Sequence, residues 1–216
     1  MDFGRSATNP GMNKTYTPNL DSNVMSRLAQ YAAQFEGDFA RSTQARWTEA
    51  YLRGLLQDGE RKSVEPLVGR IELPAECQVD DPVQAVRHFV GHAPWDTQAV
   101  LRRYRRILAG MFASPLGIFV FDDTSWPKQG THSVGVQRQY CGALGKKSNC
   151  QVAPSIQYVA PNGHFPLALR LYLPKSWIAD PARLDEAKVP PEFRTHKTKP
   201  QIALELLDEV RSEGIP

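Results

Sequence analysis

The sequence predicts an α+β protein in which a helical N-terminal part precedes a sheet. Apolar residues recur at helical spacing up to about residue 112. After Pro115 the spacing changes to two, which is typical of strands. Pro161-Asn162-Gly163 then provides a hairpin turn between two strand-like runs. We expect three segments: a disordered arm at residues 1–22, a helical domain at 23–112 and a sheet-containing domain at 113–216.

Composition places the chain among ordinary globular proteins. It has 216 residues, of which 41% are hydrophobic and 23% charged, enough to bury a core. Its formal charge of +3 permits an anionic partner such as nucleic acid. The three cysteines lack paired spacing, and no run reaches the ~18 apolar residues of a membrane span. We therefore expect a cytoplasmic protein without disulfides or membrane contact.

The N-terminal half predicts an arm followed by five helices. Residues 1–22 are polar, contain Pro and Gly, and show neither helical nor strand spacing. Helical spacing begins behind candidate caps at Ser22 and Asn23. The five helices are marked by Val24, Leu28, Tyr31 and Phe35; by Trp47, Tyr51 and Leu55; by Val64, Leu67, Val68 and Ile71; by the opening Asp80-Asp81-Pro82; and by Val100, Leu101, Tyr104, Leu108 and Met111.

The C-terminal half predicts three strands and a closing helix. "GIFVFDD" predicts a short, buried strand, and "CQVAPSIQYVA" and "HFPLALRLYLP" predict the hairpin. Residues 174–197 are charged and contain several prolines, so we expect a long surface connection there. The helix is expected to begin at Thr198 and to end at Gly214. The expected core positions are Leu167, Leu169, Leu171 and Leu173 on the hairpin, and Ile202, Ala203, Leu206 and Val210 on the helix.

Two adjacent acids, Asp122 and Asp123, follow the first apolar run. A hydrogen-bonded turn is the simplest explanation for such a pair. The neighbouring cations favour a different one, because an unpaired buried carboxylate is costly and a divalent ion with a phosphate backbone would compensate it. Magnesium prefers oxygen ligands and keeps several waters, so one or two Asp suffice. The neighbouring cations are Lys128, Arg138, Lys146 and Lys147.

Three other motifs have weak or no support in the sequence. "GALGKKS" resembles a phosphate-binding loop, but two residues separate its glycines where that motif requires four. His132, Cys141, Cys150 and His164 lack the paired spacing of zinc ligands and are expected to be packing and loop residues. No nucleophile elbow of the form G-x-S-x-G is present.

Longer stretches resemble a known family. "DDTSWPKQGTHSVGVQRQYCGALGKKSNCQVA", "RLYLPKSWIAD" and "HKTKPQIALELL" resemble the DDE transposases of bacterial insertion sequences, most closely the insertion sequence seven-zero-one family. "YLRGLLQDGERKSVEPL" and "QAVRHFVGHAPWD" are similar to the helical N-terminal part of that family. The resemblance runs from about residue 25 to the end. It implies a ribonuclease-H-like core, here a strand, hairpin strands and a helix.

The resemblance also implies a reaction. In the family, three carboxylates (Asp, Asp and Glu) hold two Mg²⁺ or Mn²⁺ ions, which promote DNA cleavage and strand transfer without a covalent enzyme intermediate. The first acid of the family corresponds to the pair Asp122-Asp123. Because side chains alternate across a strand, only one of the two is expected to face the metals, and the sequence does not say which.

The resemblance favours a DNA-binding role for a set of arginines on one helix. "LRRYRRIL" places Arg102, Arg103, Arg105 and Arg106 on one helix, which by itself is compatible with an ordinary solvated face. In a transposase, phosphate contact is the better interpretation, because arginine forks match phosphate oxygens. These arginines, with Lys128, Arg138, Lys146 and Lys147, are the predicted DNA contacts. Trp126 is a candidate for stacking on an unpaired base or for core packing.

The sequence departs from the family at its C-terminal end. The second Asp and the Glu are expected after the helix that ends at Gly214, and neither is present. We expect a truncated, inactive transposase fragment; the alternative is a non-catalytic DNA-binding fragment that competes with or regulates full-length transposase. Whether the chain is an enzyme is left open. The expected partners are transposon-end and target DNA near the bacterial nucleoid, and a second copy through an exposed sheet edge.

Overall fold

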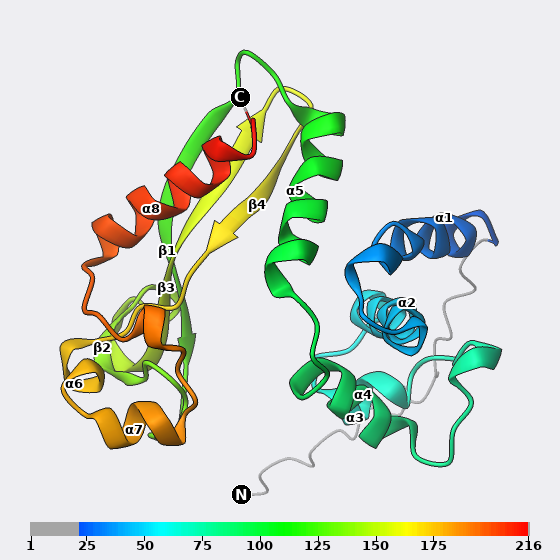
Figure 1. Cartoon of the computed structure of the whole chain (residues 1–216), viewed down its shortest axis with the longest axis horizontal. Coiled ribbons are helices and arrows are strands. Elements are labelled where there is room, and N and C mark those ends of the chain that lie inside the picture. Colours follow the sequence, from blue (N-terminus) through cyan, green and yellow to red (C-terminus); the bar gives the residue numbers. More distant parts are fainter. Residues whose placement is uncertain (1–21, 216) are drawn as a thin grey trace, which may run out of the picture. The chain divides into compact units, whose positions relative to one another are not determined.

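The computed structural model describes residues 22–215 (Figure 1). Contacts within the chain divide it into two compact units, one up to Val100 and one from Leu101 onward. The predicted arm lies outside the described residues, except that residue 22 opens the first helix. Helix α5 (Thr97–Phe112) crosses the division between the units, so the domain boundary predicted after residue 112 stays a prediction.

The N-terminal unit is helical, as the sequence predicts. Its helices begin and end close to the expected positions: α1 (Ser22–Ala33), α2 (Ser42–Leu56), α3 (Val64–Val68) and α4 (Pro82–Gly91). Asp81 caps α4, because its carboxylate accepts a hydrogen bond from the backbone N–H of Gln84 at 2.9 Å. None of the helices among residues 22–215 combines the length and the apolar character that a bilayer crossing demands.

The core of the N-terminal unit lies where α2, α3 and α4 meet. Leu67 and Val86 are buried there, and Trp47 and Tyr51 pack against them. Gly54 on α2 permits this close packing, because a Cβ at its position would lie 2.0 Å from a methyl carbon of Leu67. A larger residue would therefore force α2 and α3 apart.

The C-terminal unit is built on a four-stranded antiparallel sheet (Figure 1). Its strands are β1 (Ile118–Pro127), β2 (Gln137–Cys141), β3 (Lys146–Ala160) and β4 (Gly163–Leu169). β3 is central: β1 pairs along one edge, and β2 and β4 pair with successive parts of the other edge. The predicted fold class, α+β, is confirmed.

One strand was not predicted. β2 has the sequence "QRQYC", whose inner positions are occupied by glutamines in place of apolar residues. Gln139 satisfies its side chain by donating a hydrogen bond to the backbone oxygen of Cys150 at 3.1 Å. Backbone pairing with β3 holds this strand in the sheet, and backbone pairing leaves no alternating apolar signal in the sequence.

One face of the sheet is covered by α5 and by α8 (Lys199–Ser212). Ile156 and Tyr158 of β3 are buried in the same cluster as Leu206 and Val210 of α8, and Phe112 of α5 packs against them. The expected stripe on the last helix is therefore confirmed for Ile202, Leu206 and Val210. This cluster is the main core of the unit.

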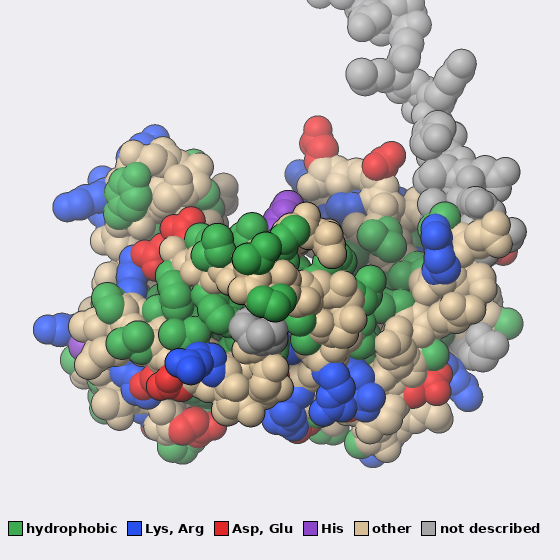
Figure 2. Space-filling view, turned by 90° about the horizontal axis from the view of Figure 1, so that it is seen from above, with side chains coloured by type: hydrophobic (Ala, Val, Ile, Leu, Met, Phe, Trp, Pro, Cys, Tyr) green, Lys and Arg blue, Asp and Glu red, His purple; other side chains and the backbone are tan. Residues whose placement is uncertain are grey.

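The opposite face of β1 is largely open, so its prediction as a buried strand was wrong. Ile118 and Val120 are 60% and 42% exposed, because β1 is an edge strand and no described element covers this face. Hydrophobic side chains also gather at the end of the unit where α5 leads into β1 (Figure 2). Met111, Leu116 and Val159 are among the exposed residues there.

The leucine alternation predicted for the second hairpin strand holds for Leu167 and Leu173, which are buried, and fails at Leu169. Leu167 is 1% exposed, whereas Leu169 is 55% exposed. The register between β3 and β4 shifts at Ile156 and Gln157, which inserts an extra residue into β4. Such a bulge turns the following side chains to the other face of the sheet.

The prediction of residues 174–197 as a surface connection was wrong, because this segment contains helices and contributes to a core. The helices are α6 (Lys175–Ile178) and α7 (Pro181–Glu186). Trp177 and Leu184 are buried with Val136 in a separate small core, and the Trp177 indole donates a hydrogen bond to the Val136 backbone oxygen at 2.8 Å. Isolated apolar residues among charges carry this core, so no periodic pattern revealed it.

Candidate functional site

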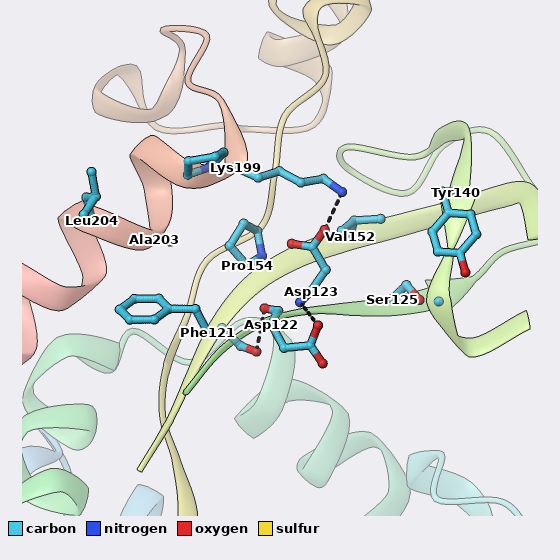
Figure 3. Close-up of a pocket in the computed structure, with 13 residues that line it drawn as sticks. Phe121, Asp122, Asp123, Ser125, Tyr140, Val152, Pro154, Lys199, Ala203 and Leu204 are labelled. Atoms are coloured by element: carbon cyan, nitrogen blue, oxygen red, sulfur yellow. Dashed lines mark hydrogen bonds and ion pairs between the residues drawn. The ribbon is translucent and has the colours of Figure 1, made fainter. Parts of the chain in front are cut away.

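The two adjacent acids lie within β1, which continues to Pro127, and they point to opposite faces of the sheet. The register pairs Asp123 with Pro154 and Asp122 with Ser155. Successive side chains of a strand alternate between faces. Figure 3 shows this arrangement, with the Asp123 carboxylate directed toward Lys199 and the Asp122 carboxylate on the other side of the strand. The structure thus separates two acids that the sequence left equivalent.

Asp123 lies on the face covered by α8, beside a cavity of about 760 Å³. Its Oδ2 atom accepts a hydrogen bond from Nζ of Lys199 at 2.6 Å. The Asp123 side chain is 42% exposed, so ions in solution reach it. A carboxylate that is partly exposed at a cavity can contact a ligand there.

Asp122 is engaged locally. Its Oδ1 atom accepts a hydrogen bond from the backbone N–H of Asp123 at 2.7 Å. Its backbone oxygen accepts a second one from the hydroxyl of Ser155 at 3.1 Å. Neither acid lies in a turn, because both belong to β1; the Asp122 carboxylate is bonded locally within the strand, whereas Asp123 makes its ion pair with a distant residue.

The cavity beside Asp123 has mostly apolar walls. Phe121, Tyr140, Pro154 and Leu204 contribute to them (Figure 3). Ser125 contributes a hydroxyl, which accepts a hydrogen bond from the backbone N–H of Ala143 at 3.0 Å and holds the turn after β2 against β1. Electrostatic interactions are stronger beside such walls than in bulk water.

Lys199 is a site residue that sequence reasoning missed. Thr198 and Gln201 form a capping box at the start of α8, in which the Gln201 side chain accepts from the Thr198 backbone N–H at 2.8 Å. This box fixes Lys199 as the first residue of the helix. The positive end of the helix dipole disfavours a cation there. The sequence did contain one indication of this role, which is a lysine at the unfavourable position directly after a capping threonine.

The donor set around Asp123 suits one ligand of a hard cation. Mg²⁺ prefers oxygen ligands and takes one or two carboxylates together with waters and phosphate oxygens. A partly exposed carboxylate beside an open cavity meets this requirement for one ligand. Across residues 22–215, however, no three His, Cys, Asp or Glu side chains come together as a group that could hold a metal ion. The described residues therefore do not form a complete divalent site by themselves.

Arg105 does not join the other predicted DNA contacts. Its side chain is 1% exposed, and its Nη1 atom forms ion pairs with Glu209 at 3.0 Å and Glu213 at 2.6 Å. Its Nε atom donates to the backbone oxygen of Leu167 at 2.9 Å. The expectation that this guanidinium meets DNA was wrong for the folded unit, because the helix turns it inward to hold α8 and β4.

The other predicted cations fall into two sets. Four lie at the β2–β3 end of the sheet: Lys128, Arg138, Lys146 and Lys147. Lys128 is tied to this end by a hydrogen bond from its backbone N–H to the backbone oxygen of Asn149 at 2.9 Å. Arg138 lines a second cavity of about 820 Å³. The second set, on α5, consists of Arg102 and Arg106, which are exposed, and Arg103, which is half-buried.

The residues considered for zinc do not assemble a site in the described part of the chain. Cys141 and Cys150 are buried with Val152 in a small cluster, as expected for packing residues. Burial raises the pKa of the Cys150 thiol. His132 and His164 are exposed. Trp126 is partly exposed on β1, so the choice between stacking and core packing stays open.

An α+β unit with a carboxylate at a cavity is found in many classes of protein. Comparison with known families identifies the class of this chain. Residues 34–216 match the family described as DDE superfamily endonuclease. The chain belongs to this family, and the resemblance found in the sequence is confirmed.

A relative with a curated description narrows the comparison. The chain is 30% identical over 162 residues to a "Probable transposase for insertion sequence element IS701" from Microchaete diplosiphon. The match covers 74% of this chain but 37% of that protein, so the chain spans little more than a third of its relative. No solved structure matches the chain.

Proposed function

We propose that this chain is the part of a DDE transposase that carries the first acid of the carboxylate triad, and that Asp123 is this acid. One observation supports the choice above all. Asp123 lies beside the cavity with a cation as its partner, whereas the Asp122 carboxylate is bonded to the adjacent backbone. The activity proposed for the whole enzyme is DNA transposition by metal-dependent phosphodiester cleavage and strand transfer.

In the proposed mechanism, Asp123 supplies one carboxylate oxygen to Mg²⁺ or Mn²⁺. When bound, such an ion activates the attacking hydroxyl or water and stabilises the leaving oxygen. The apolar cavity wall, which includes Phe121 and Leu204, limits the water around this carboxylate and so strengthens its attraction for a cation. Asp122 acts indirectly, because its bond to the Asp123 backbone N–H fixes the strand geometry beside the acid.

DNA is the proposed substrate. Arginine and lysine side chains bind phosphate oxygens and release counterions, so exposed cations near the site are the proposed contacts. The proposed contacts are the cations at the β2–β3 end and those on α5, without Arg105, because Arg105 is buried. The proposed contacts are Arg102, Arg103, Arg106, Lys128, Arg138, Lys146 and Lys147.

We propose that the 216-residue chain binds DNA without cutting it. The support is that residues 22–215 gather no three-carboxylate group. The test is a nicking assay on supercoiled plasmid with Mg²⁺ or Mn²⁺, accompanied by a DNA-binding titration at several salt concentrations. We expect no nicks and an affinity that falls steeply with salt. Nicking that disappears in Asp123→Asn would show that the chain is catalytic by itself.

The same titration tests the proposed contacts. Replacing Lys128, Arg138, Lys146 and Lys147 by glutamine is expected to weaken binding and to lower the salt dependence by about one unit of slope per lost phosphate contact. Lys188→Gln is a matched control, since this exposed lysine lies outside both sets. An unchanged affinity in the fourfold variant would show that the binding surface lies elsewhere.

We further propose that the chain self-associates and that it acts in the cytoplasm, at the nucleoid. Among the described strands, β1 pairs with β3 alone, which leaves its second edge without a strand. Unpaired edges favour pairing between chains. Sedimentation at increasing protein concentration is expected to show association, and a monomer at all concentrations would contradict this part of the proposal.

A further inference from the structure

We propose that Lys199 is an internal counter-ion of Asp123, with which a divalent cation must compete for this carboxylate. Lys199 is thereby a positioning residue that lowers the affinity of Asp123 for a divalent cation. The inference rests on the proposed role of Asp123, and it assigns a role to a residue that the carboxylate triad does not include.

The geometry sets the two cations in competition for one carboxylate. Nζ of Lys199 lies 2.6 Å from Oδ2 of Asp123, and the lysine side chain extends from α8 to the carboxylate (Figure 3). A magnesium ion binds carboxylate oxygen at about 2.0–2.1 Å. An ion that takes Oδ2 requires the ammonium to move away, and an ion that takes the other oxygen is repelled by the ammonium beside it.

Local helix preferences do not explain why a lysine occupies this position. The first turn of a helix favours acids, because the backbone N–H groups there carry partial positive charge. Lys199 is the first residue of α8, and its ion pair with Asp123 offsets this unfavourable place. Its ammonium also lies 5.7 Å from the ring centre of Tyr172, a second attractive contact on the same side of the sheet.

Lys197 provides a matched comparison two residues earlier. It pairs with Glu205 at 2.7 Å, and its side chain is 36% exposed, close to the 32% of Lys199. Both lysines therefore make one short ion pair at similar exposure. They differ in their partner, because Lys197 does not touch Asp123. Removing either charge changes the net charge equally, so a difference between the two variants isolates the competition at Asp123.

The experiment measures Mn²⁺ binding to the whole chain, without DNA, by the electron paramagnetic resonance signal of free Mn²⁺. Lys199→Met keeps the length of the apolar stem and removes the charge. We expect its Mn²⁺ affinity to rise about two- to fivefold, the range set by the strength of a partly exposed ion pair. Lys199→Arg is expected to remain near the original affinity, and Lys197→Met is the control with no change. Circular dichroism verifies that each variant is folded.

The outcomes separate this inference from the proposed function. Asp123→Asn tests the function, since it must abolish the Mn²⁺ site if Asp123 is a ligand. If Asp123→Asn removes binding while Lys199→Met leaves the affinity unchanged or equal to that of Lys197→Met, Asp123 remains the acid and the competition is refuted. If Asp123→Asn leaves the Mn²⁺ affinity unchanged, both proposals fail. If neither the original chain nor Lys199→Met binds Mn²⁺, removing the charge has not strengthened binding and the competition is refuted, whereas the proposed function, in which further ligands complete the site, stands. A lysine that only anchors α8 to β1 would lower the unfolding temperature in Lys199→Met without raising the affinity.

Discussion

The two faces of β1 differ in what covers them. On one face, Phe119 packs against the core that α5 and α8 form on the sheet, and Asp123 pairs with the first residue of α8. On the other face, Ile118, Val120 and the Asp122 carboxylate have no described helix over them. A single strand thus presents one side to a packed core and the other to solvent.

This difference explains why two identical adjacent acids have different surroundings. A shift of one residue along a strand exchanges the faces. Both acids line the cavity, but only the Asp123 carboxylate pairs with the helix terminus, through Lys199, whereas the Asp122 carboxylate accepts a hydrogen bond from the adjacent backbone. The following predictions test the contrast between the covered and the open face, beginning with the largest expected effect.

The largest effect is expected for Arg105→Met, beneath the covered face. The substitution removes the buried cation of Glu209 and Glu213, although Glu209 keeps its ion pair with Arg170. Breaking a fully buried pair costs about 3–5 kcal/mol of unfolding free energy, which is the upper limit expected here because both glutamates are partly exposed. Urea unfolding of the C-terminal unit measures the loss. Arg106→Met on the same helix is the control, because that side chain is exposed and should change stability by less than about 0.5 kcal/mol. Equal losses in the two variants would contradict the inward position of Arg105.

A similar loss is expected for Leu206→Ala, on the buried stripe of α8. Leu206 is 2% exposed in the main core, and truncating a buried leucine costs about 2–5 kcal/mol. Leu204 provides the control on the same helix, since it is 60% exposed. Leu204→Ala should change the unfolding midpoint little. If the two substitutions were equivalent, α8 would not pack on the sheet as described.

A smaller and pH-dependent effect is expected for Glu205→Gln at the rim of the covered face. A hydrogen bond from Lys197, with a contribution from Arg170, lowers the pKa of the Glu205 carboxyl below its usual 4.5. The charged form therefore stabilises the fold above this value and loses its contribution as pH falls through the lowered pKa. Because the side chain is partly exposed, the effect at neutral pH is at most about 1 kcal/mol.

Thermal unfolding between pH 3 and pH 7 checks this prediction. The original chain and Glu205→Gln should differ at neutral pH and converge in acid. Glu192→Gln supplies a control, because Glu192 is exposed nearby and forms no ion pair in the described structure. A difference that widened in acid would mean that the carboxyl is destabilised by its surroundings.

The smallest effect is expected on the open face. Val120→Thr replaces an exposed methyl group by a hydroxyl and should change the unfolding free energy by less than about 0.5 kcal/mol. It is also expected to lower the tendency to associate, because it reduces the exposed apolar area. Sedimentation and urea unfolding measure the two quantities. A loss near that of Leu206→Ala would show that this face is covered after all.

Much of the fold could be predicted because its elements carry regular patterns. The helices of the N-terminal unit and α8 have apolar stripes, and Asp81 and Thr198 mark helix starts by their side-chain caps. The elements that were missed lack such patterns. β2 depends on backbone pairing, and the small core around Trp177 depends on single apolar residues brought together by α6 and α7.

The candidate site was predictable in part. The acid doublet and its strand were visible in the sequence, but the choice between the two acids depends on which face α8 covers. That choice requires the register of β1 with β3 and the position of Lys199, two long-range facts. Arg105 was misplaced for a related reason, since its partners Glu209 and Glu213 are distant in sequence and give no local sign of pairing.

The central place of β3 determines when the acid can take its position during synthesis. β1 is synthesised before β3, the strand that pairs with it, because β3 follows β1 in the chain and the pairing extends to Val159. Until β3 has followed, Asp123 lies on a strand without pairing partners, and its ion-pair partner Lys199 is 76 residues further along the chain. The ion pair thus forms only after the hairpin and the start of α8 have followed, and its formation would report that the C-terminal unit has closed.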